Sequence, residues 1–67
     1  MTLWKNVHIA VPTNGQDCWF VRIPFFDTPV LGTYRNLGVS IPGFDWTDSN
    51  GDAQVTTVDQ VFKWRPT

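Results

Sequence analysis

The segment Val61-Phe62-Lys63-Trp64-Arg65-Pro66, near the end of the 67-residue chain, decides the fold. Its alternation of side chains is typical of a β-strand, with Val61 and Lys63 on one face and Phe62 and Trp64 on the other. Proline lacks a backbone N–H, so Pro66 ends the strand. We therefore expect Trp64 to close a small β core, and we expect the chain to be complete at this terminus.

The composition extends this prediction to the whole chain. There is no glutamate, and five glycines and five prolines are spread through the sequence. Valine, threonine, isoleucine and aromatic residues, which favour strands, dominate the remainder. We predict a single all-β domain over residues 1–67, built as a small antiparallel, bent sheet or an SH3-like open barrel of five to six short strands.

The positions of turn residues divide the chain into expected strands. These are Trp4–Ala10, Cys18–Ile23, Val30–Arg35, a short one at Val39–Ile41, a hairpin pairing Phe44–Thr47 with Ala53–Thr57, and a closing strand from about Val58.

Two details of packing follow from these strands. In the second, we expect Trp19, Val21 and Ile23 to form the core face, rather than Cys18, Phe20 and Arg22. In the third, Gly32 indicates a bend or a bulge.

Size, charge and cysteine content limit the class of protein. A chain of this length buries a marginal core, so self-association or docking on a protein partner is expected. The single Cys18 excludes an intrachain disulfide and favours the reducing cytoplasm. Five dispersed basic residues against six aspartates argue against a nucleic-acid partner, and no apolar run is long enough to cross a membrane.

The most unusual stretch is the loop from Pro24 to Pro29, in which two prolines bracket Phe25 and Phe26. One interpretation is a plug, with both rings folded over the open end of the barrel. The other is an exposed apolar patch that binds a protein partner. Trp46, flanked by polar residues, is the tryptophan most suited to exposure and joins the patch as a partner-binding candidate.

The tryptophans also allow a carbohydrate-binding module as an alternative. Trp4, Trp19, Trp46 and Trp64 offer rings on which a sugar stacks, although core packing explains the same residues.

The window from Asp48 to Asp59 resembles a calcium-binding loop of the EF-hand type, in its dockerin variant. Oxygen-bearing side chains at Asp48, Asn50, Asp52 and Asp59 match ligand positions. Ala53, however, stands where those loops need glycine, and no helical sequence flanks the window. The alternative is a type I′ hairpin turn at Asn50-Gly51 with solvated aspartates beside it.

An enzyme finds little support in this sequence. Cys18 and His8 are the only thiol and imidazole, and nothing in their spacing requires them to meet. One cysteine and one histidine also cannot form a structural zinc site. We therefore predict a protein without catalytic residues and without a cofactor.

A resemblance spans much of the chain. Trp4 with Val7, Pro12 with Gly15, the strand Trp19–Arg22, Pro29-Val30-Leu31 with Tyr34, Phe44, and the ending Lys63-Trp64-Arg65-Pro66 follow one another in order. This order resembles small β domains of unknown function from bacteriophages, prophages and gut bacteria, which open on a tryptophan and close on a Trp-x-Pro motif. Lys63 and Arg65 replace the usual histidine and methionine.

The resemblance implies a compact β fold in a phage or phage-derived setting. It implies a non-catalytic protein-interaction module, located in the virion as an accessory or in the cytoplasm as a host-protein binder. The alternative is a calcium- or carbohydrate-binding β module.

Overall fold

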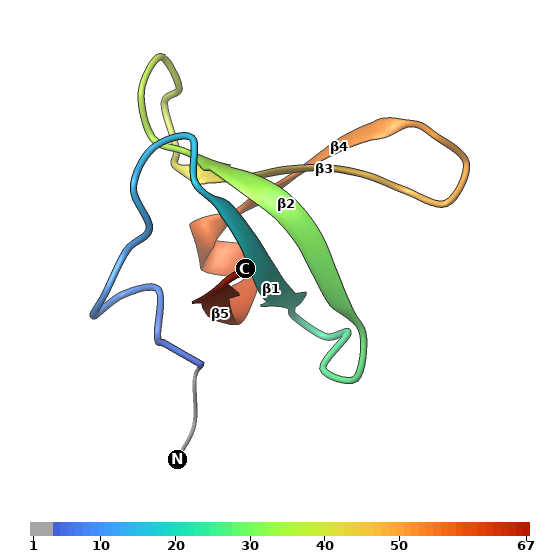
Figure 1. Ribbon diagram of the computed structural model, residues 1–67, viewed down its shortest axis with the longest axis horizontal. Coiled ribbons are helices and arrows are strands. Elements are labelled where there is room, and N and C mark those ends of the chain that lie inside the picture. Colours follow the sequence, from blue (N-terminus) through green and yellow to red (C-terminus); the bar gives the residue numbers. More distant parts are fainter. Residues whose placement is uncertain (1–3) are drawn as a thin grey trace.

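The computed structural model describes residues 4–67 and places five strands in one antiparallel sheet (Figure 1). The elements are β1 (Asp17–Arg22), β2 (Pro29–Arg35), β3 (Gly43–Thr47), β4 (Ala53–Thr57), the 3-10 helix η1 (Val58–Gln60) and β5 (Val61–Pro66). Their order in the sheet is β4-β3-β2-β1-β5, so the sheet is open, with β4 and β5 at its edges. The all-β prediction is confirmed. No helix within the described residues has the length and apolarity needed to cross a membrane.

Two of the predicted strands are wrong. Within Trp4–Ala10 only Lys5 pairs with another strand, through an isolated bridge to Trp64. The chain then turns, because the Asn6 carbonyl accepts hydrogen bonds from the amides of Ile9 and Ala10. Residues Val39–Ile41 form bends instead of a ladder, and both apolar side chains at the ends of that segment are exposed. Gly38, with a φ of +73°, and Pro42 flank this segment and account for the irregular path.

The core lies on one face of the sheet, here called the inner face. Its buried members are Val7, Cys18, Phe20, Tyr34, Phe44, Val61 and Trp64. At its centre the rings of Phe20 and Phe44 stack with 4.6 Å between their centroids. These aromatic contacts bury large areas in a small domain and account for much of its stability.

The predicted core face of β1 is wrong. Cys18 and Phe20 are fully buried on the inner face, whereas Ile23 is exposed. Val21 is also buried, although it points to the opposite, outer face. Both faces of β1 are apolar, so its alternation did not identify the side that packs against Phe44.

Of the bend or bulge expected at Gly32, the bulge is absent, because the register between β1 and β2 runs unbroken through Cys18 and Gly32. Its missing side chain leaves space for a close approach instead. A Cβ atom at this position would lie 2.8 Å from Cε1 of Phe20 and 2.7 Å from the carbonyl oxygen of Asp45. The glycine therefore leaves room for the Phe20 ring and for the neighbouring β3 backbone.

The structure confirms that Trp64 of the closing strand lies in the core, but the predicted alternation of faces along this strand is wrong. Trp64 is buried, with 3% of its surface exposed, and its Nε1 donates a hydrogen bond of 2.7 Å to the Ala10 carbonyl. The register against β1, however, shifts so that Phe62 is an extra residue between Val61 and Lys63. A bulge of this kind breaks the alternation of faces, so residues on its two sides that are three apart share one face. Val61 and Trp64 therefore both point into the core, and Phe62 lies outside, half exposed.

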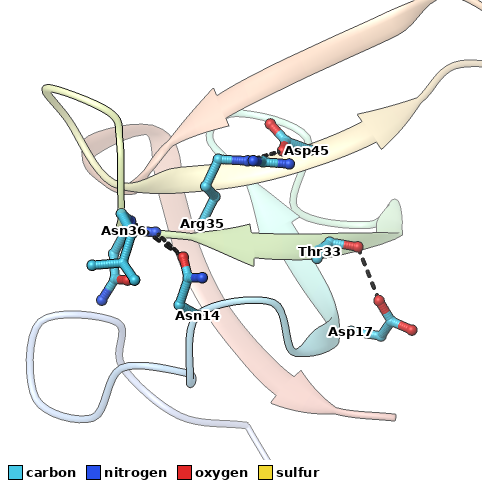
Figure 2. A network of polar contacts seen from close by, with 7 residues as sticks. Asn14, Asp17, Thr33, Arg35, Asn36 and Asp45 are labelled. Atoms are coloured by element: carbon cyan, nitrogen blue, oxygen red, sulfur yellow. Dashed lines mark hydrogen bonds and ion pairs between the residues drawn. The ribbon is translucent and has the colours of Figure 1, made fainter.

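Residues 4–16, called the N-terminal arm, loop beside the sheet before β1 begins (Figure 1). The arm buries Val7 in the core. It is held to β2 where the Gly15 amide donates to the Tyr34 carbonyl, and where Asn14 Oδ1 accepts from the amides of Asn36 and Leu37. Figure 2 shows the Asn14–Asn36 contact.

Polar pairs decorate the outer face of the neighbouring strands (Figure 2). The Thr33 hydroxyl donates to Asp17 across β1 and β2, and Arg35 forms an ion pair with Asp45 across β2 and β3. Because these groups are exposed, each pair contributes only about 0–1 kcal/mol. They set the register of the sheet more than its stability.

Candidate functional site

A cationic side chain lies between two aromatic rings on the inner face, beyond the end of the core. The Arg22 guanidinium carbon is 4.5 Å from the ring centroid of Phe25 and 4.6 Å from that of Trp46. Such contacts stabilise a cation through the negative face of each ring. We call these three residues the Arg22 slot.

The fold places the three residues together from separate elements. Arg22 ends β1 on the same face as Phe20, and the chain then turns at Pro24 so that Phe25 returns over the guanidinium. Trp46 comes from β3, where its Nε1 donates a hydrogen bond of 2.9 Å to Thr56 Oγ1 on β4. Its ring also meets the edge of Phe20 at 6.5 Å. The tryptophan therefore has a fixed orientation.

The positive charge of Arg22 has no partner of opposite charge among residues 4–67. Its Nε is buried without a hydrogen-bond partner, and among residues 4–67 no carboxylate forms an ion pair with it. A buried donor without an acceptor costs about 1–3 kcal/mol, more when it carries charge. Arg65 Nε is buried without a partner in the same way, so the orphaned Nε alone does not mark a site. The Arg22 guanidinium has no neutralising carboxylate among residues 4–67, and its terminal nitrogens therefore suit an incoming anion.

An open pocket of about 280 Å³ lies beside the slot. Besides the slot residues, its lining consists of Ile23, Gln54, Val55, Thr56, Thr57 and Gln60. This volume is below the usual range of small-molecule sites, roughly 300–1,000 Å³, and suits one or two side chains. Arg22 is the only charged residue in the lining, so the pocket offers one cation, amide and hydroxyl groups, and no acid–base pair.

The residues predicted to bind a partner separate into two groups. Pro24, Phe25, Phe26 and Pro29 are all exposed, with Phe25 at 53% and Phe26 at 51%, so neither ring plugs the core. Phe25 and Trp46 meet through Arg22. Phe26 instead makes an edge contact of 5.2 Å with Phe62, which the bulge has turned to the outer face.

Two basic side chains of β5, Lys63 and Arg65, lie close together on the outer face, next to aromatic rings. Lys63 lies 4.9 Å from the Trp4 ring and 5.5 Å from the Phe62 ring, and Arg65 lies 5.3 Å from Trp4. Their attraction to the rings binds this part of the N-terminal arm to β5. These contacts lie within the chain and stabilise its fold.

The four residues of the calcium hypothesis do not come together. Asp48, Asn50 and Asp52 lie in the β3–β4 turn, whereas Asp59 lies beyond β4 in η1, where it accepts a hydrogen bond from Thr57. In the described part of the chain, no group of three histidine, cysteine or acidic residues has the geometry of a metal site.

The β3–β4 turn also differs from the predicted type I′ form. That form needs a positive φ at both central residues, but only Gly51, at +84°, has one. The Gly51 amide donates to the Asp48 carbonyl and the Asp48 amide to the Asp52 carbonyl, which defines a three-residue loop with a glycine bulge.

Both Asp48 carboxylate oxygens are occupied by local donors, the amides of Asn50 and Asp52 and the side chain of Gln54. These hydrogen bonds, that from Asp52 foremost, lower the pKa of Asp48.

The thiol and the imidazole occupy different environments. Cys18 is fully buried, and burial, with a smaller effect of Asp17, raises its pKa to about 11. His8 is exposed in the turn of the N-terminal arm. No hydrogen bond links the two side chains in residues 4–67, so the thiol has no base beside it to form a thiolate.

The four tryptophans behind the carbohydrate-binding alternative lie in different environments. Trp64 is buried in the core, and the ring of Trp46 carries the Arg22 guanidinium. Trp4 and Trp19 are only half buried, which the sequence did not indicate.

Comparison with models of known protein families, with curated proteins and with solved structures finds no match. Sequence reasoning identified Phe25 and Trp46 but missed Arg22, Gln54 and Gln60. A signal for Arg22 existed, since it shares a strand face with Phe20 and a charged residue on a core face needs a partner.

Proposed function

We propose that the chain is a non-catalytic protein-interaction module that binds its partner at the Arg22 slot. The supporting observation is the guanidinium held between Phe25 and Trp46, with no counter-ion supplied by residues 4–67. Arginine and aromatic residues are enriched at the centres of protein interfaces, where they contribute most of the binding energy. The half-exposed Phe25 ring supplies apolar area next to the charge.

Two further features favour binding over catalysis. Cys18 remains a protonated, buried thiol, and the pocket beside the slot contains no second titratable group. We propose a phage or phage-derived setting on the strength of the sequence resemblance, with the module acting as a virion accessory or as a host-protein binder in the cytoplasm.

The two half-exposed phenylalanines on opposite faces provide the test. Phe25→Ser removes a wall of the slot, whereas Phe62→Ser removes a ring of matching exposure, 50% against 53%, on the outer face. Both proteins, with wild type, are immobilised and exposed to bacterial lysate, and the retained proteins are quantified by mass spectrometry.

We expect a protein that wild type and Phe62→Ser retain and Phe25→Ser loses, with all three chains equally folded by circular dichroism. If every retained protein is insensitive to Phe25→Ser, the slot is not the binding surface.

A further inference from the structure

The outer edge of β4 is open. β4 is the terminal strand of the sheet, and no backbone group elsewhere in residues 4–67 hydrogen-bonds to its outer side. The β3–β4 ladder is fixed at its two ends by the bonds Asp48 N–Asp52 O and Val58 N–Pro42 O. Because hydrogen-bonded pairs alternate along an antiparallel ladder, Gln54 and Thr56 bond to β3. Ala53, Val55 and Thr57 therefore direct their N–H and C=O groups outward.

This edge lacks the residues that usually protect an exposed strand. Charged side chains and proline guard many natural edges against pairing, but Ala53-Gln54-Val55-Thr56-Thr57 contains neither. Val55, at the centre of the outward row, is 66% exposed. The outward N–H and C=O groups of β4 are therefore available to pair with another strand.

The open edge and the Arg22 slot are neighbours, because Gln54, Val55, Thr56 and Thr57 line the pocket beside the slot. A segment paired with β4 would place the residue opposite Val55 on the outer face and the residues on either side of it over the inner face. A long acidic side chain at such a position points toward the unmatched guanidinium.

We propose that the partner contributes an extended segment that adds to β4 as a sixth strand and places one carboxylate on Arg22. This inference rests on the proposed function and specifies its ligand. Backbone pairing would supply affinity and the carboxylate specificity, as in other cases of strand addition. A planar carboxylate matches the guanidinium through two parallel hydrogen bonds.

A second copy of the chain fits the edge less well. A symmetric β4–β4 pair centred on Val55 would add Ala53–Thr57 of the second copy as the sixth strand, and that strand contains no carboxylate to place on Arg22. A foreign segment with an acidic residue supplies one.

Two seven-residue peptides test the proposal directly. Both alternate threonine and valine, and they differ only in a central glutamate or glutamine. Binding to wild type, Arg22→Gln, Val55→Pro and Val55→Thr is followed by titration in two-dimensional amide NMR spectra, which also report folding. Val55→Pro removes the outward N–H, and Val55→Thr keeps it together with the branched side chain.

We expect wild type and Val55→Thr to bind the glutamate peptide about tenfold more tightly than the glutamine peptide. Arg22→Gln should bind both peptides equally, and Val55→Pro should bind neither.

Three results would overturn the inference: no binding of either peptide at millimolar concentration, equal affinity of wild type for both, or undiminished binding by Val55→Pro. A concentration-dependent dimer that Val55→Pro abolishes would show that a second copy takes the edge. In each case, Phe25-dependent capture of a protein from lysate would leave the proposed function standing.

Discussion

The two edges of the sheet are finished in different ways. On β5, the outward N–H and C=O of Trp64 both bond to Lys5 of the N-terminal arm, at 3.0 and 2.7 Å. On β4, the outward groups of Val55 meet no backbone group of residues 4–67. β5 also carries Lys63, Arg65 and Pro66, residues that discourage pairing, whereas β4 carries none.

The difference shows that the chain uses its own residues to protect the edge on which its core depends. Trp64 belongs to that core, so an exchange of partners on β5 would compromise folding. β4 extends away from the body of the sheet with β3 (Figure 1), and only Thr56 of its residues is buried. Its edge is therefore free for an interaction that leaves the core intact.

The largest expected effect concerns the protected edge. Trp64→Ala removes a buried ring and its hydrogen bond to Ala10, so we expect a loss of about 3–5 kcal/mol in the free energy of unfolding, measured by urea denaturation. Phe62→Ala, two residues earlier in the same strand but half exposed, should cost about 1 kcal/mol. Similar costs for the two variants would contradict the assignment of Trp64 to the core.

A matched pair of proline substitutions compares the edges directly. Lys5→Pro removes the N–H that bonds to Trp64, and we expect it to cost about 1 kcal/mol. Val55→Pro removes an N–H without a partner at an edge, so its cost should stay within about 0.5 kcal/mol. Thermal denaturation measures both.

Lys5→Ala serves as the control, because it keeps the backbone N–H and removes only the ammonium contact with the Trp64 ring. A Val55→Pro variant less stable than Lys5→Pro would show that Val55 faces β3 instead of the open edge.

The smallest effect concerns the turn that leads into β4. Hydrogen bonds lower the pKa of Asp48 in the folded chain, so its carboxylate stabilises the fold above its unfolded pKa of about 3.8. That contribution is lost as the pH falls through the folded pKa. We expect Asp48→Asn to show a smaller decline in melting temperature between about pH 5 and about pH 2 than wild type. Identical pH profiles would exclude the carboxylate as a turn anchor.

Much of the strand pattern was predictable from local sequence. The β3–β4 hairpin lies where Phe44–Thr47 and Ala53–Thr57 were expected, with β3 starting one residue earlier. β2 also starts one residue earlier than predicted, and β1 is shifted by one residue at both ends. Glycine, proline and asparagine mark these turns through the backbone angles they permit, which is information present in the chain itself.

The choice of faces was not predictable in the same way. One extra residue at Phe62 reverses the side to which Val61 points, and its signature is a register with β1, which lies far away in sequence. The slot has the same origin. Arg22, Phe25 and Trp46 meet because β1 and β3 belong to one bent sheet, and no spacing between them specifies that contact.

The sole cysteine offers a practical use for this architecture. Its thiol is fully buried in the aromatic core and stays protonated at physiological pH, because its pKa is raised to about 11. Alkylating reagents attack the thiolate, so modification has to wait until the sheet opens. The rate of alkylation at Cys18 therefore reports the rate of global unfolding, and mass spectrometry measures it without an introduced label.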